Sequence, residues 1–270
     1  MEANFSFALL LTTLAGCSTA IGGVIAWLIG KPKDWQLALI LGFSAGVMIY
    51  VSFMELLPVA IGKAGSLVGY LGFFVGIIFI AILDIAIPHE YKEEHTVITH
   101  EGGSEKRRYH HRLRENRRSL MLHTGILTAL GITIHNVPEG LAVFSSAVAG
   151  DTTLGILVAA AVALHNIPEG VIVFIPINEA TGNSKRAFLT SLFSGLAEPV
   201  GALLGYAILA PFISPKLLAS LLAFAAGIMI YISLDELLPA SREYGSAHLT
   251  MVGIGFGMLI MAMSFILIVH

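Results

Sequence analysis

The sequence predicts an all-α, polytopic membrane protein with eight transmembrane helices, in which an inverted repeat relates spans 1–3 and 6–8 around spans 4–5. Three observations predict this fold: an apolar composition, eight long apolar segments, and a stretch that occurs twice. The 270 residues are 56% hydrophobic and only 12% charged, with a mean hydropathy of +0.84. Soluble proteins carry about 25% charged residues, so the composition excludes a soluble globular protein.

Eight segments approach or exceed the length of about 20 apolar residues that a bilayer core demands. They cover 5–29, 36–58, 67–88, 120–146, 153–177, 187–210, 217–239 and 249–269. We divide the chain into residues 1–89 with spans one to three, a cytoplasmic loop at 90–118, and residues 119–270 with spans four to eight. All eight spans belong to a single transmembrane domain.

The positions of Lys and Arg predict the orientation of these spans, because cytoplasmic loops carry an excess of both. With the amino terminus outside, 13 of the 15 Lys and Arg residues fall on the inner side, and only Lys63 and Lys216 fall outside. We therefore expect a multi-pass protein of the cell (inner or plasma) membrane with both termini extracytoplasmic.

The single cysteine, Cys17, excludes an internal disulfide and a zinc site of several thiolates. Residues 14–17, Leu-Ala-Gly-Cys, resemble a lipoprotein cleavage box. A signal peptide needs a basic leading region, however, and residues 1–13 contain no Lys or Arg. We therefore interpret 5–29 as an uncleaved first span.

The repeated stretch lies in the second and seventh spans. Residues 41–58 align without gaps to 222–239, with 12 of 18 positions identical, among them the pairs Glu55 with Glu236 and Pro58 with Pro239. Five crossings separate the two copies, so they run in opposite directions. Inverted repeats are typical of transporters that alternate access around a site at the membrane midplane.

Between the two copies lie two near-identical motifs, His-Asn-Val-Pro-Glu-Gly at 135–140 and His-Asn-Ile-Pro-Glu-Gly at 165–170. His and Glu four residues apart share one face of a helix. Each proline lacks an N–H and so frees the carbonyl four residues earlier, that of Ile134 or of Leu164. Each motif thus offers an imidazole, a carboxylate, an amide and a backbone oxygen at about the same depth, which are the ligands of a cation.

A purely structural role, as hydrogen-bonded core residues, would also account for these histidines. A carboxylate at the bilayer centre costs about 2.5–3.5 kcal/mol on insertion scales. Glu139, Glu169 and Glu198 lie in spans with no Lys or Arg at that depth. A bound cation supplies the missing positive charge, so we favour a metal site over a purely structural network.

The ligand types narrow the choice of ion. Imidazole, carboxylate and amide without thiolate suit first-row divalent metals, and histidine argues against a dedicated calcium or magnesium site. Zn²⁺ and Fe²⁺ are favoured, and Mn²⁺, Co²⁺ and Cd²⁺ fit the same ligands. Two motifs with two glutamates have room for one ion or for two ions bridged by a carboxylate. We expect the metal as transported substrate and no cofactor.

The paired motifs, Glu198-Pro199 in the sixth span and the eight-span layout together resemble the ZIP (Zrt/Irt-like) divalent-metal transporters, in particular their bacterial ZupT branch. The resemblance covers essentially the whole chain. It implies uptake of zinc, iron(II) and related metals into the cytoplasm through a binuclear centre. His135, Glu139, His165 and Glu169 would form one metal site. Asn136, Asn166 and Glu198, with the bridging glutamates, would form the second.

The family pattern also implies a relay at the ends of the spans. Asp84, His89, Asp235 and Glu236 would form its exit, with Glu55 as an entrance ligand, although solvated helix ends would explain these residues equally well. Histidines of the charged loop have been linked to metal sensing in this family, but a solvated connector is the simpler interpretation of residues 90–118. The sequence assigns no role to His123, His248 or His270.

The resemblance further implies alternating access, in which a bundle of spans 1, 4, 5 and 6 moves against a bundle of spans 2, 3, 7 and 8. Small residues of the second span would lie opposite those of the seventh and allow close helix contact. These are Gly42, Ala45 and Gly46, with Ala223, Ala226 and Gly227.

Three rival functions share some of these features. An intramembrane metalloprotease needs His-Glu-x-x-His, but Glu93 stands where the second histidine should follow His89-Glu90, so we expect no enzyme. The second rival is a metal-selective channel with the same ligands, and the third is a metal-sensing receptor without flux. The expected partners are divalent metal ions and the lipid bilayer, not nucleic acid, and a homodimer is left open.

Overall fold

The computed structural model describes residues 2–30, 32–86, 103–148, 152–209 and 214–269, and every element in these ranges is helical. The elements run in the order α1 (Glu2–Ile29), α2 (Asp34–Tyr50), η1 (Val51–Leu56), α3 (Leu57–Ala64), α4 (Ser66–Ala86), α5 (Gly103–Val148), α6 (Thr152–Thr181), α7 (Ser184–Gly195), α8 (Ala197–Leu209), α9 (Pro215–Tyr231), η2 (Ile232–Leu237), α10 (Leu238–Tyr244) and α11 (Ala247–Val269). The prediction of an all-α fold is confirmed.

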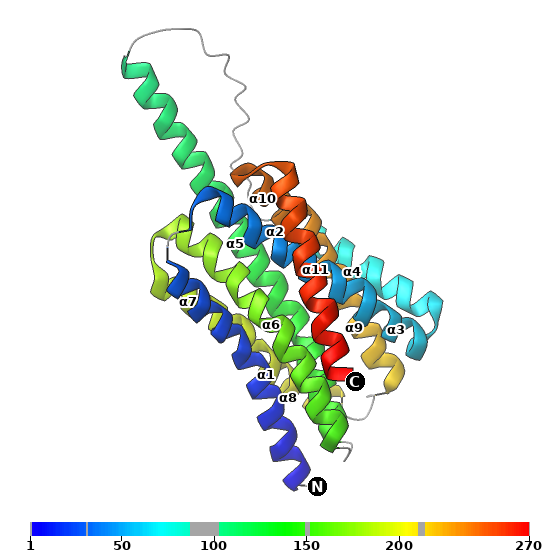
Figure 1. The fold of residues 1–270 in the computed structure, drawn as a ribbon. Coiled ribbons are helices and arrows are strands. Elements are labelled where there is room, and N and C mark those ends of the chain that lie inside the picture. The colour runs from blue at the N-terminus through cyan, green and yellow to red at the C-terminus, as the bar shows by residue number, and fades with distance from the viewer. Residues whose placement is uncertain (1, 31, 87–102, 149–151, 210–213, 270) are drawn as a thin grey trace.

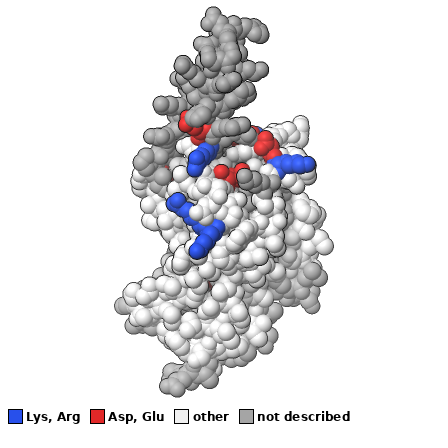
Figure 2. Space-filling model, turned by 90° about the vertical axis from the view of Figure 1, so that its left-hand side faces the viewer, with Lys and Arg blue, Asp and Glu red and all other residues white. Residues whose placement is uncertain are grey.

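Eight helical stretches in the described part of the chain are long and apolar enough to cross a membrane. They match the eight predicted spans one for one, from 4–29 to 247–266. Figure 1 shows them as a bundle of long helices, with the amino-terminal part of α5 projecting beyond the end that is opposite the N-terminus. Figure 2 shows acidic and basic side chains gathered in the upper part of one face, above a lower part that is white.

The helices form two groups. In the first, α1, α5, α6, α7 and α8 pack on one another. In the second, α2 packs on α11 and α10, and α4 packs on α9 and α3. We call these the first bundle and the second bundle. They correspond to spans 1, 4, 5 and 6 and to spans 2, 3, 7 and 8, and they meet where α5 contacts α9 and η2 and where α6 contacts α2 and α11.

Glycines hold helices together within each bundle. A Cβ at Gly46 would lie 2.1 Å from the carbonyl oxygen of Ile254 in α11, and one at Gly227 would lie 2.0 Å from that of Phe73 in α4. Only a residue without Cβ permits such an approach of two backbones. The prediction that the small residues of the second and seventh spans face each other is therefore wrong, because Gly46 packs on α11 and Gly227 on α4.

The second and seventh spans continue past the prolines at which we expected them to end. Helix α2 passes through the π-helix η1 into α3, which ends at Ala64, and α9 passes through η2 into α10, which ends at Tyr244. Pro58 and Pro239 are the second residues after these wider turns. A π-turn hydrogen bonds five residues apart rather than four, so the missing proline N–H and the bulk of its ring are accommodated without ending the helix.

Two further boundaries differ from the prediction. Helix α5 begins at Gly103, so the second half of the expected loop is helical and continuous with the fourth span. Its sequence is rich in Glu, Lys and Arg and lacks proline, which favours helix over a loop. The sixth span is interrupted at Leu196, where α7 ends, and α8 begins with Ala197. This break places Glu198 in the first turn of α8.

Candidate metal centre

The two repeated motifs lie in the middle of α5 and α6, which pack against each other in the first bundle. Pro138 and Pro168 are accommodated inside these helices, and neither helix is interrupted. His135 Nε2 lies 3.0 Å from Glu169 Oε1, and His165 Nε2 lies 3.2 Å from Glu139 Oε2. Each histidine therefore pairs with the glutamate of the other motif, and all four side chains are at most 3% exposed.

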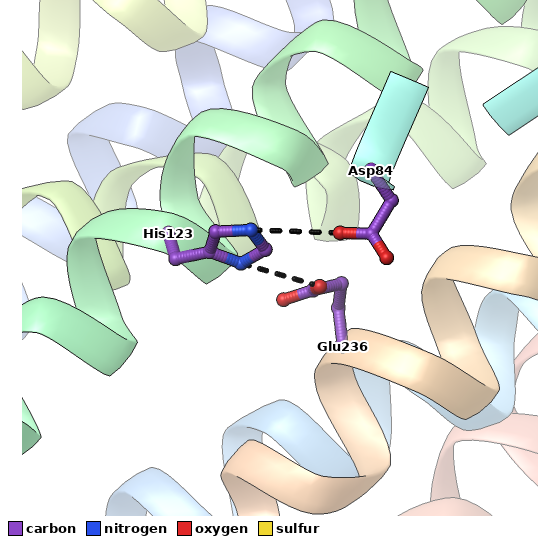
Figure 3. A group of neighbouring side chains, drawn as sticks. All are labelled: Asp84, His123 and Glu236. Carbon is purple, nitrogen blue, oxygen red and sulfur yellow. Dashed lines mark ion pairs between the residues drawn. The ribbon is translucent and has the colours of Figure 1, made fainter. Parts of the chain in front are cut away.

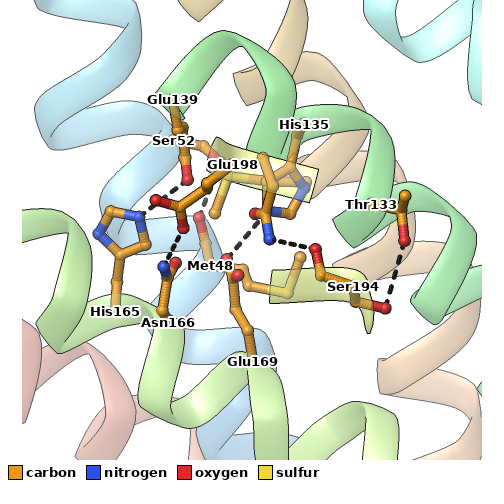
Figure 4. Close-up of polar contacts among 12 residues, drawn as sticks. Met48, Ser52, Thr133, His135, Glu139, His165, Asn166, Glu169, Ser194 and Glu198 are labelled. Atoms are coloured by element: carbon orange, nitrogen blue, oxygen red, sulfur yellow. Dashed lines mark hydrogen bonds and ion pairs between the residues drawn. The ribbon is translucent and has the colours of Figure 1, made fainter. Parts of the chain in front are cut away.

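The asparagines of the motifs fasten α5 and α6 to neighbouring helices. Asn136 donates to the backbone oxygen of Ser194 in α7 at 2.9 Å. Asn166 donates to the backbone oxygen of Ala15 in α1 at 3.0 Å and also to Glu198 Oε1 in α8 (Figure 4). Five helices of the first bundle thus meet at the two motifs, and Glu198 joins the histidines and glutamates in one buried polar cluster.

The close packing of the helices explains why each motif ends in glycine. A Cβ at Gly140 would lie 2.2 Å from the backbone oxygen of Glu198, and a Cβ at Gly170 would lie 1.8 Å from that of Thr19. Both distances are shorter than any side chain tolerates, so only glycine lets α5 approach α8 and α6 approach α1 this closely. The motif therefore combines metal-ligand types with a residue that brings the helices carrying them together.

Seven possible ligand atoms of this cluster are buried and have no hydrogen-bond partner among the described residues. They are Nδ1 of His135 and of His165, Oδ1 of Asn136 and of Asn166, Glu139 Oε1, Glu169 Oε2 and Glu198 Oε2. A buried polar atom without a partner costs free energy, and an unpaired charge costs more. Three carboxylates and two imidazoles with vacant lone pairs form a set of ligands that a divalent cation would satisfy.

The four ligands assigned to one ion are arranged as two pairs. Among the described residues, three His, Cys, Asp or Glu ligand atoms lie within 4.8 Å of one another only at Asp84, His123 and Glu236. At the centre, His135 with Glu169 and His165 with Glu139 each form a two-ligand unit instead. Holding one ion with all four residues therefore requires the two pairs to move closer together.

Glu55, predicted as an entrance ligand, lies in η1 of the second bundle and is half-buried. Its Oε1 atom is buried and has no hydrogen-bond partner among the described residues. Glu55 interacts electrostatically with His165 and Glu139, so it faces the centre from across the boundary between the bundles. Next to it, Ser52 donates to the backbone oxygen of Met48 at 2.7 Å, and Figure 4 shows both residues beside the motif side chains.

The predicted exit residues are only partly brought together. Asp84 of α4 and Glu236 of η2 are both buried and converge on His123 of α5 (Figure 3). His123 Nε2 lies 3.5 Å from Asp84 Oδ1, and His123 Nδ1 lies 3.4 Å from Glu236 Oε1. Asp235 is exposed and does not belong to this group of three, and His89 lies outside the described residues.

Sequence reasoning missed three parts of these sites. His123 received no role because its partners lie 39 and 113 positions away in the chain, and no local motif surrounds it. The backbone oxygens of Ala15 and Ser194, which hold the motif asparagines, carry no signal in the sequence. A search for polar residues at equivalent depths of different spans would have found His123 with Asp84, but not the two backbone oxygens.

Comparison with known proteins agrees with this geometry. A sequence profile of the ZIP zinc transporter family matches residues 1–84 and 87–264. A zinc transporter ZupT of Chlorobium luteolum is 49% identical over 275 residues, which cover 98% of this chain and 99% of the relative. Proteins of the same name from Clostridium perfringens and Streptococcus mutans are 45% and 44% identical, and each alignment covers at least 97% of both chains. The chain therefore belongs to the ZIP zinc transporter family.

Proposed function

We propose that this protein carries Zn²⁺ across the membrane through the buried cluster formed by the two motifs. One observation carries the proposal. Seven buried ligand atoms of the cluster have no hydrogen-bond partner among the described residues, and four of them belong to the paired histidines and glutamates. The similar proteins are named zinc transporters and align over nearly the full length of the chain. Members of this family are transporters, so the metalloprotease alternative is excluded.

The finer assignment of ligands belongs to this proposal. His135, Glu139, His165 and Glu169 hold one ion, and Asn136, Asn166 and Glu198 hold a second with help from the bridging glutamates. The contact between Asn166 and Glu198 supports the second site. So do the Oδ1 atoms of both asparagines, which remain available while their amide nitrogens are fixed to neighbouring helices.

Fe²⁺ is a further substrate in this proposal, and Mn²⁺, Co²⁺ and Cd²⁺ suit the same ligands. Net movement is uptake into the cytoplasm, with both termini extracytoplasmic. The distribution of Lys and Arg along the sequence supports this orientation, because the loops that carry them follow odd-numbered spans.

Alternating access is the proposed mechanism. The first bundle carries the motif ligands, and the second bundle provides the surface against which it moves. The inverted repeat supports a second arrangement of similar energy, and the π-helices η1 and η2 occupy equivalent positions of the two copies, 181 residues apart. Burial of all four central side chains fits a carrier better than a channel, because a continuous open pore would expose them to water.

The relay residues serve entry and release in this scheme. Glu55 faces the central cluster and passes an ion to it, while Asp84 and Glu236, with Asp235 and His89, receive the ion on the other side. A homodimer is also part of the proposal, and its mass in detergent would test it. The exposed apolar side chains of α4 and α11 provide surfaces for lipid or for a second copy.

Zinc flux into liposomes that contain the purified protein tests the main proposal, with Fe²⁺, Mn²⁺, Co²⁺ and Cd²⁺ as competitors. We expect saturable zinc accumulation, and we expect Glu139→Gln to reduce it to the rate of empty liposomes. Glu243→Gln is the matched control, because Glu243 is an exposed glutamate of α10. Undiminished flux in Glu139→Gln would contradict the site, and zinc binding without any flux in the wild type would favour a receptor.

A further inference from the structure

The sixth span is interrupted directly beside the central cluster. Helix α7 ends at Gly195, and α8 begins with Ala197, one residue before Glu198. Pro199 has no N–H to donate to the backbone oxygen of Gly195, four residues earlier, so the break lies where a continuous helix would lose a hydrogen bond. A ligand next to such a break needs other contacts to keep its place, because metal ligands are held in position by the residues around them.

One face of α5 runs alongside the break. Four residues of this helix lie four, three and four positions apart, and this spacing places them in a single stripe. The first three surround Ser194 of α7, before the break, and the last lies against Glu198 of α8, after it. The stripe therefore spans the interruption. Its members are Ala129, Thr133, Asn136 and Gly140.

Ser194 is buried and is held by three groups of the stripe (Figure 4). Its hydroxyl donates to the backbone oxygen of Ala129 at 3.3 Å. The hydroxyl of Thr133 lies 2.6 Å from the same oxygen and 3.2 Å from Ser194 Oγ. The backbone oxygen of Ser194 accepts from the side-chain amide of Asn136 at 2.9 Å. In an uninterrupted helix this oxygen would accept from the N–H four residues on, so a side chain of α5 supplies a donor at the break.

Helix α1 holds the break from another side. A Cβ at Gly16 would lie 2.4 Å from the backbone oxygen of Gly195, and a Cβ at Gly195 would lie 2.2 Å from that of Gly16. The two backbones are therefore in direct contact, which only glycine permits. Together with the contact of Gly140 with Glu198, these approaches fix the interrupted segment between α1 and α5.

The packing presents two ligands in a defined orientation. Glu198 is fully buried, its Oε1 accepts from Asn166, and its Oε2 has no hydrogen-bond partner among the described residues. Asn136 is arranged in the same way, because its nitrogen is fixed to Ser194 and its Oδ1 has no such partner. In each residue one polar atom is held and the other is available to an ion. Ser194 is connected to both, through the break to Glu198 and directly to Asn136.

All of these contacts lie inside the first bundle. Helices α1, α5, α6, α7 and α8 pack on one another, and none of the groups that hold the break comes from the second bundle. If the first bundle moves as a unit, Glu198 therefore keeps its position relative to the motif histidines and glutamates. The ligands of an ion would then stay together while the ion is carried.

We propose that Thr133 and Ser194 are positioning residues, which fasten the break of the sixth span to α5 and thereby orient Glu198 and Asn136 toward the second central ion. The inference deepens the proposed function and rests on it for the assignment of that ion. Neither hydroxyl binds the ion. Each acts through the ligand whose place it sets.

Zinc binding to the purified full-length chain, measured by equilibrium dialysis, tests this role. Thr133→Val keeps nearly the same shape and removes the hydroxyl. We expect the affinity for the second central ion to fall about 10–100-fold, the usual cost of losing an outer partner of a ligand, while the first ion binds as in the wild type. Thr133→Ser keeps the hydroxyl and should bind both ions as the wild type does.

Thr13→Val is the matched control. Thr13 is also half-buried, and its hydroxyl donates to the backbone oxygen of Leu9 within α1 at 2.7 Å, just as that of Thr133 does to Ala129 within α5. It differs from Thr133 in having no printed contact with another helix, so its loss should leave the affinity for both ions unchanged.

A merely structural role of Thr133 predicts different results. General loosening of the fold would weaken both ions, whereas positioning of Glu198 affects one. In the background of Glu198→Gln, which removes the carboxylate to be positioned, Thr133→Val should change zinc binding no further, because the two substitutions act on the same interaction. Wild-type affinity in Thr133→Val, or equal weakening of both ions, would overturn the proposal.

Should Thr133→Val fail to fold, Ser194→Ala removes the other hydroxyl of the contact and must weaken the same ion, and unchanged binding would overturn the proposal equally. Dialysis measures binding alone, so a wild type that binds two ions but transports none would refute the proposed transport and leave these affinities decisive. If Glu198→Gln lost no ion, the assignment of the second ion and this inference would fail together.

Discussion

Gly170→Ala is the substitution whose effect the structure determines most directly. The new Cβ would lie 1.8 Å from the backbone oxygen of Thr19, and real Cβ atoms essentially never come closer than 3.0 Å to such an atom. Helix α6 must therefore move away from α1 by about 1.2 Å at least. Overpacking of this kind costs about 1–3 kcal/mol of folding free energy.

The same movement acts on the metal centre. Asn166 donates to the backbone oxygen of Ala15 across this interface at 3.0 Å, and a further shift of about 1.2 Å would break that bond. Glu169 and His165 lie on the same helix and would be displaced together. We expect zinc uptake to fall strongly and the unfolding temperature to fall by about 2–4 °C for each kcal/mol lost.

Gly255→Ala is the matched control, because a Cβ at this glycine of α11 meets nothing within 4 Å. Both variants would be compared with the wild type by thermal unfolding in detergent and by zinc uptake into liposomes. Gly255→Ala should behave as the wild type in both assays. If Gly170→Ala unfolded and transported like Gly255→Ala, the close approach of α1 and α6 would not be needed, and our explanation of the motif glycine would be wrong.

Three further predictions concern the ligands. Tyr231→Phe removes the hydrogen bond to Asp84 Oδ2, so the proposed release of zinc past Asp84 should slow and zinc uptake should fall, while dialysis shows the central ions retained. Glu198→Gln removes one carboxylate beside Asn166, so the chain should bind one central ion fewer, and an unchanged zinc count would contradict the binuclear assignment. Zinc uptake should fall as external pH drops from about 8 to 5, because a protonated imidazole has no lone pair for metal; a flat profile would exclude the motif histidines as ligands.

The number and order of the spans could be predicted because they depend on local composition alone. Apolar length decides whether a segment crosses the bilayer, and each segment carries that information by itself. Helix ends were harder to predict. Pro58 indicated a helix end by its chemistry, but the π-turn in front of it lets the helix continue to Ala64. Such a turn depends on how the helix packs against its neighbours, and this packing cannot be predicted from the local sequence.

The metal ligands could be predicted as residue types but not as pairs. The four-residue spacing predicted that His135 and Glu139 share one face of α5, and both side chains are indeed buried at the centre. Which histidine meets which glutamate depends on how α5 and α6 slide along each other, and the structure pairs His135 with Glu169 instead. His123 shows the same limit more strongly, because only the packing of α5 on the second bundle gives it partners.

The two kinds of packing in the molecule indicate where it can move. Inside each bundle, glycines bring backbone against backbone, as at Gly170 with Thr19 and at Gly46 with Ile254. Across the boundary, Gly131 of α5 instead meets the side-chain ends of Ile232 and Ile228. Backbone contacts fix one register, since any shift produces a clash, whereas flexible side chains can adapt to several. Relative movement is therefore expected between the bundles and not within them.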